Sequence, residues 1–239
     1  MYHYVREPSD ELPNFRYLNV DDFRKQLDYF KSEFGFVTRD EFRKYIENGT
    51  MPSKAGKIIL TFDDGTSDHY NYVYKELIKR DLWGFFFITS EPLISQSFLD
   101  VHRIHLLCGK YDGTLLIDKL NKLISKEIID DRYIDKFDDK IYLDQSNAES
   151  ITNFKKTLNY FIKDNHRTKL IDEIMKEFKI NISSEKFYLN DSQIKEMHNN
   201  GMCFGSHTRS HRLLSTLNYN LQLDEIKSSI SYIERLLNT

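Results

Sequence analysis

Residues 57–89 read KIILTFDDGTSDHYNYVYKELIKRDLWGFFFIT, and this stretch decides the fold. It opens with an apolar, β-branched run from Lys57 to Phe62, which predicts a strand buried on both faces. Apolar residues at helical spacing follow between Tyr70 and Ile78, and residues 84–89 are again strand-like. This strand–helix–strand order predicts parallel strands joined by a right-handed crossover, and therefore an α/β fold.

The flanking segments continue the alternation. Before residue 57, apolar residues predict a helix that Gly35 ends; they are Phe23, Leu27, Phe30 and Phe34. Thr38 and Glu41 form a capping-box pattern, which predicts the start of a second, shorter helix. Near the C-terminus, residues 194–200 predict a helix, residues 202–204 a strand, and residues 223–237 a last helix.

From about residue 95 to 188 the sequence is rich in lysine and aspartate and shows only helical periodicity. We interpret this stretch as a helical insertion in a single domain that spans residues 1–239. A chain of 239 residues is long enough to bury one large core together with a small subdomain.

Charge and composition narrow the class of partner. The formal net charge is -3 with both signs interspersed, so no basic face predicts a nucleic-acid partner. Two cysteines, Cys108 and Cys203, are too few for a disulfide framework. The first residues, MYHYVREPSD, do not resemble a signal peptide, and no apolar run is long enough to span a membrane. We therefore expect a cytoplasmic protein with a neutral or small-molecule partner and leave its oligomeric state open.

Two short polar motifs follow predicted strands, TFDDG at residues 61–65 and GSHTRSH at residues 205–211. In parallel α/β folds, functional groups collect at such strand ends. Asp63 and Asp64 are adjacent, so their side chains diverge on an extended backbone, and one can bind a metal while the other faces a substrate. Taken alone, Asp-Asp-Gly is more typical of a solvated turn.

His207 and His211 are four residues apart, a spacing at which one helical turn or a tight loop can direct both rings at one cation. Taken alone, this spacing fits an incidental surface pair equally well. One carboxylate and two imidazoles would leave coordination positions open, as a catalytic metal requires. The hydroxyls of Ser206 and Thr208 are candidates to orient these ligands from behind.

Together, TFDDG and SHTRSH resemble the motifs of the polysaccharide deacetylases of the NodB-homology class. The resemblance implies a distorted, and in this chain incomplete, (β/α) barrel and a metal-dependent hydrolase that removes an N-acetyl group from a carbohydrate. It implies that Asp63 is the general base and that Asp64, His207 and His211 bind one divalent ion. Zn²⁺ is the expected ion, and Co²⁺, Ni²⁺, Fe²⁺ and Mn²⁺ are alternatives.

Motifs that most members carry after the histidine motif are not found in this chain. The start MYHYV is similar to the N-terminal strand of the poly-N-acetylglucosamine deacetylase branch, and on that resemblance His3 is the general acid. Arg103 is a candidate to replace the family's arginine and bind substrate. His102 and His105, at helical spacing beside it, are expected to be helix residues rather than ligands.

Three alternatives stay open at this stage. The chain can be a catalytically silent relative that binds carbohydrate, or a hydrolase of another amide or of an O-acetyl ester. It can also be an assembly component for surface polysaccharide whose helical insertion binds a partner. The expected cytoplasmic location favours a nucleotide-linked or lipid-linked sugar over a finished extracellular polymer.

Overall fold

The computed structural model describes residues 1–129, 148–180 and 183–238. The chain divides into two compact units. Unit 1 consists of residues 1–8, 17–97 and 183–239, and unit 2 consists of residues 9–16 and 98–182. None of the helices in the described ranges combines the length and apolarity needed to cross a membrane.

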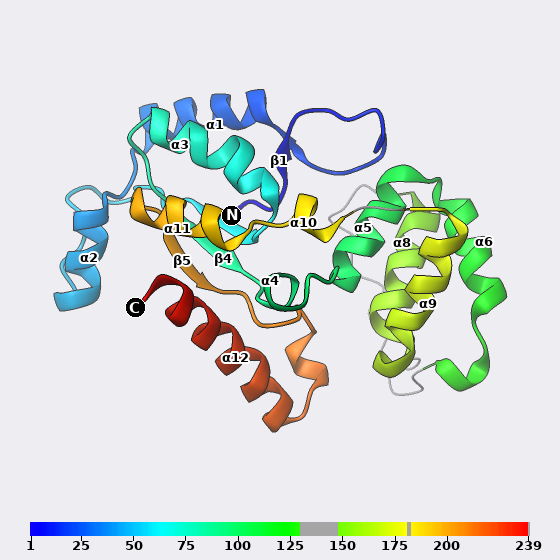
Figure 1. The fold of residues 1–239 in the computed structure, drawn as a ribbon. Coiled ribbons are helices and arrows are strands. Elements are labelled where there is room, and N and C mark those ends of the chain that lie inside the picture. The colour runs from blue at the N-terminus through cyan, green and yellow to red at the C-terminus, as the bar shows by residue number, and fades with distance from the viewer. Residues whose placement is uncertain (130–147, 181–182, 239) are drawn as a thin grey trace. The chain divides into compact units, whose positions relative to one another are not determined.

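Unit 1 contains two parallel sheets (Figure 1). The larger sheet has the order β3 (Thr61–Asp64), β4 (Phe85–Ile88), β5 (Cys203–Ser206), and the smaller pairs β1 (Val5–Arg6) with β2 (Leu18–Asn19). Tyr2 forms a parallel bridge with Phe62, and its N–H donates to Thr61 O at 2.9 Å. The first residues of the chain therefore run beside β3. Within the described residues the strands do not close into a barrel.

A row of aromatic rings crosses this sheet. Phe62, Phe86 and Phe204 are in register on neighbouring strands, and Tyr2 extends the row. Their ring centroids lie 5.5 Å apart for Tyr2 and Phe62, 4.8 Å for Phe62 and Phe86, and 5.6 Å for Phe86 and Phe204, all in stacked arrangement. Because side chains alternate along a strand, this register gathers the rings on one face and builds the core of unit 1 there.

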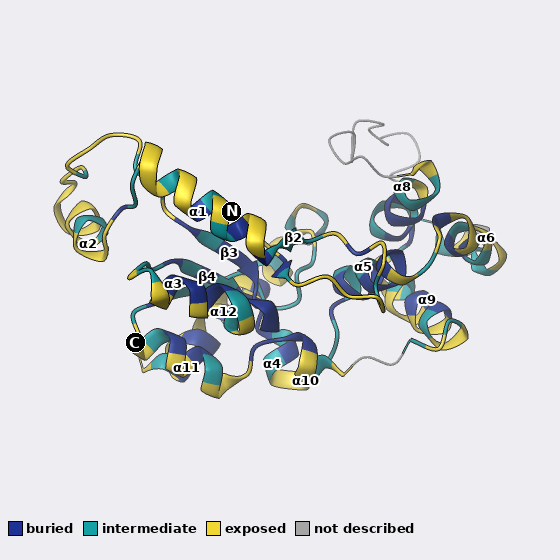
Figure 2. Ribbon diagram, turned by 90° about the horizontal axis from the view of Figure 1, so that it is seen from above, coloured by how far each residue is buried: buried dark blue, intermediate teal, exposed yellow. Residues whose placement is uncertain are grey.

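Helices pack on the core with their apolar faces. They are α1 (Val20–Glu33), α3 (Lys75–Lys79), α11 (Asp191–Asn199) and α12 (Tyr219–Leu237). Each contributes residues to the same hydrophobic cluster: Phe23 and Leu27, Leu77, Ile194 and Met197, and Ile233 and Leu236. Figure 2 shows exposed residues on the opposite side of α1. Unit 1 also contains a π-helix η1 (His69–Tyr74), the short helices α4 (Glu91–Ser95) and α10 (Ser184–Phe187), and the 3₁₀ turn η4 (Leu214–Thr216).

The predicted helix boundaries near the N-terminus are confirmed. Gly35 follows α1 with a φ of 74°, and its N–H donates to Phe30 O. Thr38 and Glu41 form a complete capping box at the start of α2 (Arg39–Asn48), which Gly49 ends in the left-handed conformation.

The predicted boundary of the first buried strand is wrong. The strand was expected at Lys57–Phe62, but β3 begins at Thr61 and runs through Asp64. Ile58 forms instead an isolated bridge with Phe36, so the apolar run is shared between two pairings. Asp63 and Asp64 are consequently strand residues, and the turn begins only at Gly65, where φ is 70°.

Unit 2 is helical in its described residues. It contains α5 (Asp100–Lys110), α6 (Gly113–Leu123), α8 (Glu149–Lys156) and α9 (Asp164–Glu177), together with the 3₁₀ helix η2 (Lys126–Ile128) and the π-helix η3 (Thr157–Phe161). The four longer helices lie side by side around their own apolar core (Figure 1). The helical periodicity predicted for this stretch is thus present, while residues 130–147 and 181–182 of the predicted insertion lie outside the described residues.

Candidate metal centre

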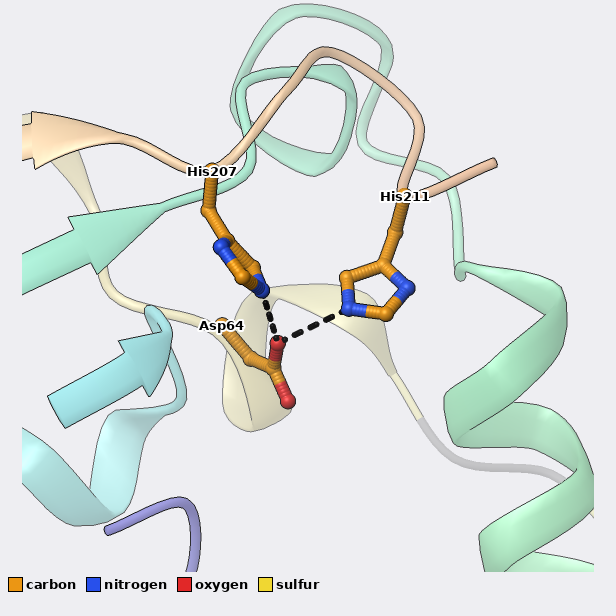
Figure 3. A group of neighbouring side chains, drawn as sticks. All are labelled: Asp64, His207 and His211. Carbon is orange, nitrogen blue, oxygen red and sulfur yellow. Dashed lines mark ion pairs between the residues drawn. The ribbon is translucent and has the colours of Figure 1, made fainter. Parts of the chain in front are cut away.

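The carboxyl ends of β3 and β5 meet at one edge of the larger sheet. Asp64 ends β3 and pairs with Ile88, which pairs in turn with Ser206 at the end of β5. His207 is the next residue, and its N–H donates to Ile88 O at 2.9 Å. The loop that follows brings His211 back toward Asp64, so three side chains from distant parts of the sequence converge (Figure 3).

One carboxylate oxygen faces two imidazole nitrogens in this cluster. Asp64 Oδ1 lies 3.4 Å from His207 Nε2 and 3.3 Å from His211 Nε2. One ligand atom from each of the three residues can be chosen such that all lie within 4.8 Å of one another. The Asp64 side chain is 4% exposed, whereas those of His207 and His211 are 31% and 30% exposed. The carboxylate is therefore held inside the protein while solvent reaches the imidazoles.

These spacings fit a divalent cation. Ligand atoms at about 2.0–2.1 Å from a tetrahedral ion lie roughly 3.3 Å from one another. The two nitrogen–oxygen distances of 3.4 and 3.3 Å match this separation. Carboxylate and imidazole are a donor set that zinc and neighbouring transition metals bind. Three protein ligands leave at least one position for water or substrate, as in catalytic sites.

The electrostatics of the cluster favour positive charge. Burial lowers the pKa of His211, but the hydrogen bond and the charge of Asp64 raise it by more, so that the pKa ends above its ordinary value. A site that holds a proton on an imidazole next to a buried carboxylate also stabilises a cation in its place.

The backbone is strained at this site. Asp64, Thr208 and His211 have φ values of 80°, 65° and 58°, in the left-handed region that residues with a side chain seldom adopt. Such conformations cluster at functional sites, because the surrounding structure must hold them in place. Here they let β3 end with a carboxylate directed at the loop, and let the loop turn tightly enough to return His211.

The hydroxyls of Ser206 and Thr208 hold the loop backbone. Ser206 Oγ accepts from the N–H of Thr208 at 3.3 Å, and Thr208 Oγ1 accepts from the N–H of His211 at 3.2 Å. The sequence predicted that these hydroxyls orient the imidazoles. That role stays a prediction, and the bonds that the hydroxyls make to the backbone hold the loop from which the two histidine side chains project.

Neighbouring helices brace the outer side of the loop. The buried carboxylate of Glu225 on α12 accepts from the N–H and the hydroxyl of Ser210. Arg209 donates to the Glu91 carboxylate at 2.5 Å, and its carbonyl accepts from the Glu91 N–H at 2.8 Å. The loop is therefore anchored to α4 and α12 on both sides of the residues that carry the imidazoles.

Asp63 lies on β3, and His3 lies in the N-terminal segment that runs beside this strand. Asp63 is 8% exposed, pairs with Phe87, and donates its N–H to Tyr2 O at 2.9 Å. His3 follows Tyr2 directly and is exposed. The bridge between Tyr2 and Phe62 therefore places the backbone of His3 at the level of Asp63 on β3. Their predicted roles as acid and base stay predictions.

Arg103 lies in unit 2, where two carboxylates pair with it. It sits on α5, is 7% exposed, and forms ion pairs with Asp100 at 3.0 Å and with Asp172. These pairs give the guanidinium a structural function within the helical unit, and its predicted contact with substrate stays a prediction. His102 and His105 are on the same helix, as expected.

His69 is a residue to which the sequence assigns no function, and the structure links it to the backbone of His3. His69 is fully buried at the start of η1, and its Nε2 lies 2.7 Å from the carbonyl oxygen of His3. The only signal in the sequence is its place in the helix that follows TFDDG. A histidine at that place has no companion motif and is easily overlooked.

Comparisons with known proteins point to one family. Residues 155–239, which include the histidine motif but not TFDDG, match the family model described as polysaccharide deacetylase. The resemblance to the polysaccharide deacetylases is confirmed. The match indicates a hydrolase of the deacetylase class. A comparison with curated protein sequences finds no significant match.

Solved structures of deacetylases share the fold over the whole chain. The deacetylase PplD of Streptococcus pyogenes, solved in complex with acetate, is 19% identical with a TM-score of 0.54, and the match covers 100% of this chain and 67% of PplD. IcaB from Ammonifex degensii is 17% identical with a TM-score of 0.51, covering 100% and 68%. A de-N-acetylase from Aggregatibacter actinomycetemcomitans is 14% identical with a TM-score of 0.54, covering 100% and 74%. At these identities the likeness establishes the α/β fold.

Proposed function

We propose that this protein is a metal-dependent carbohydrate deacetylase that hydrolyses the N-acetyl group of an amino sugar. The observation that carries the proposal is the convergence of Asp64, His207 and His211 at the edge of a parallel sheet. The family match and the shared fold support the same reaction class. The substrate is then an N-acetylated sugar in a polysaccharide, an oligosaccharide or a sugar-linked precursor.

The three residues would hold one divalent ion, with Zn²⁺ expected from the imidazole ligands. When bound, such an ion supplies Lewis-acid chemistry, polarising an acetamide carbonyl and lowering the pKa of a water molecule. The buried Asp64 carboxylate would contribute the negative charge, and the half-buried imidazoles would leave the ion open to solvent on their side.

Asp63 and His3 would supply the proton transfers. Asp63 would accept a proton from the attacking water, because it neighbours the ligand Asp64 and is not itself one of the three ligands. His3, at the level of Asp63, would donate a proton to the leaving amine, so that acetate and a free amino sugar result. Ser206 and Thr208 would act by holding the loop that carries the two imidazoles.

We further infer that the two sheets form part of an open (β/α) barrel of the NodB type. The bridge between Tyr2 and Phe62 supports this inference, because it joins both sheets in the order β2, β1, β3, β4, β5. In this interpretation residues 1–239 are one domain, and residues 95–188 are a helical insertion.

The test is acetate release from chitooligosaccharides, with and without a chelator, and after the chelated protein is reloaded with Zn²⁺. The proposal expects activity that disappears on chelation and returns on reloading. Asp63→Asn serves as the matched variant, because it changes one atom of a residue that is not among the three ligands. Absence of acetate release by the Zn²⁺-loaded protein from a panel of N-acetylated sugars would refute the proposal.

A further inference from the structure

His69 is buried against the aromatic core of unit 1. It is fully buried at the first position of η1, and its ring centroid lies 5.8 Å from that of Phe62 and 5.6 Å from that of Phe86. A histidine packed against two stacked phenylalanine rings needs hydrogen-bond partners, because an unpaired polar group in an apolar core is costly. The hydrogen bond of its Nε2 therefore indicates what this residue does.

The imidazole holds the backbone of His3. His69 Nε2 lies 2.7 Å from the carbonyl oxygen of His3. A carbonyl oxygen can only accept, so Nε2 carries a hydrogen and donates it. This bond spans 66 residues of sequence and joins the helix after TFDDG to the N-terminal segment.

Asp68, which precedes His69, holds the N-terminal segment at a second point. Arg6 donates to both carboxylate oxygens of Asp68, from Nε at 2.8 Å and from a terminal nitrogen at 2.9 Å. The Asp68 side chain is 4% exposed. Two-bond pairing of this kind fixes orientation as well as distance. Asp68 and His69, at the start of η1, thus bind Arg6 and the backbone of His3.

We propose that Asp68 and His69 form a clamp on the N-terminal segment, and that His69 is a positioning residue for proton donation by His3. The proposal rests on the proposed function. The His3 side chain is exposed, so its reach toward the leaving amine depends on where its backbone is fixed. The clamp fixes that backbone beside Asp63, and displacement by about 1 Å can lower a rate roughly 100-fold.

The first test compares two leaving groups in the Zn²⁺-loaded full chain. The variant His69→Phe keeps an aromatic ring against Phe62 and Phe86 but cannot donate to the His3 carbonyl. Amide hydrolysis requires protonation of the amine, whereas 4-nitrophenyl acetate releases a stable anion and needs no acid. We expect kcat for chitooligosaccharide deacetylation to fall about tenfold or more with an unchanged KM. The rate on the aryl ester should fall at least about fivefold less.

The second test asks whether His69 acts through His3. In the His3→Ala background, the further change His69→Phe should leave kcat for the amide unaltered, because the group that His69 positions is already absent. An equal fall in both backgrounds would overturn the proposal. A His69→Phe variant with wild-type kcat would also overturn it. So would a variant whose rates on the amide and on the aryl ester fall by the same factor.

Two more variants distinguish the loss of the clamp from a folding defect. His69→Gln can still donate a hydrogen bond and should recover part of kcat, while Arg6→Met releases the other half of the clamp and should reproduce the selective loss on the amide. His198→Phe, at a histidine on α11 without a proposed function, is the matched control and should keep wild-type kcat. A wild-type protein without deacetylase activity would refute the proposed function. An active wild type that tolerates His69→Phe and Arg6→Met would refute the clamp alone.

Discussion

Asp63 and Asp64 are neighbours in the sequence with different proposed tasks. Asp64 Oδ1 faces both imidazoles of the cluster, whereas Asp63 is not among the ligand group. Replacing Asp63 by Asn should therefore leave Zn²⁺ bound while turnover falls by a factor of about 10²–10⁴, the usual contribution of a general base. Metal content by elemental analysis and initial rates of acetate release check this expectation. Loss of metal together with activity would show that Asp63 is itself a ligand.

The Thr208 hydroxyl gives a second prediction at this scale. It accepts from the backbone N–H of His211 at 3.2 Å and so holds a ligand that has a strained φ of 58°. Thr208→Ala removes this support and should weaken Zn²⁺ affinity about tenfold, as is common when a partner behind a ligand is lost. Thr208→Ser keeps the hydroxyl and is the matched control. Equal affinities of the Ala and Ser variants in a competition titration would contradict the prediction.

Individual site residues could be predicted from the sequence where a short motif carries them. Asp64, His207 and His211 stand in compact motifs that directly follow buried strands, and the parallel sheet brings those strand ends together. His69 could not be predicted in this way. Its partner is a backbone carbonyl 66 residues distant, and a main-chain acceptor leaves no pattern of residue types in the sequence.

At the scale of elements, the start of α2 is sensitive to pH. Glu41 closes the capping box: it accepts from Lys57 Nζ at 2.6 Å and from the Thr38 N–H at 2.9 Å. These two bonds, with two weaker ones from Ser53, lower the pKa of Glu41 from 4.5 to about 2. A carboxyl group with a lowered pKa stabilises the folded state above its ordinary pKa, and this contribution is lost as the pH falls through the folded value.

We therefore expect the amides of α2 to lose hydrogen-exchange protection as the pH falls from 4.5 toward 2, after correction for the intrinsic exchange rate. Glu41→Gln removes the titrating charge and should abolish this dependence. The side-chain resonance of Glu41 gives its pKa directly. A titration midpoint near 4.5 would contradict the capping geometry.

The junction after β3 gives a stability prediction with a built-in control. Gly65 has a φ of 70°, and a Cβ added there would lie 2.9 Å from Ile88 Cγ2. Gly49 has a similar φ of 73° but nothing within 4 Å of an added Cβ. Gly49→Ala measures backbone strain alone, and Gly65→Ala adds a steric clash with β4. The free energy of unfolding in urea should fall by roughly 1–3 kcal/mol more for Gly65→Ala. Equal losses would show that Ile88 moves aside freely.

Element types could be predicted from periodicity, whereas strand ends could not. The run from Lys57 to Phe62 is uniformly apolar, so it carries no mark of where one pairing ends and the next begins. Ile58 pairs with Phe36, and the ladder with β4 starts only at Thr61. These partners are set by tertiary contacts, which a local pattern does not contain. The same limit applies to η1, because a π-helix is not distinguished by helical spacing.

At the scale of the whole molecule, a bound ion should stabilise unit 1. The ion would tie the ends of β3 and β5, which lie more than 140 residues apart in sequence. A ligand at about 100 times its Kd adds roughly 2.7 kcal/mol to the free energy of unfolding, which corresponds to a rise in Tm of about 5–10 °C for a chain of this size. Thermal unfolding of the metal-free protein with and without Zn²⁺ measures this shift. The control is the His207→Ala variant, whose Tm should not change when Zn²⁺ is added.

Sequence patterns predicted the α/β class and the helical stretch of this molecule. The βαβ unit at residues 57–89 fixed the parallel order of β3 and β4, and the return of a strand near Phe204 placed β5 beside them. The division into two compact units depends on which helices share a core, and periodicity within each helix does not determine this.

The most direct test of the account is calorimetric titration of the metal-free protein with Zn²⁺. The account predicts one ion per chain in the wild type, and no specific binding after Asp64, His207 and His211 are all replaced by alanine. A wild-type chain that binds no ion, or a triple variant that binds Zn²⁺ as tightly as the wild type, would contradict it.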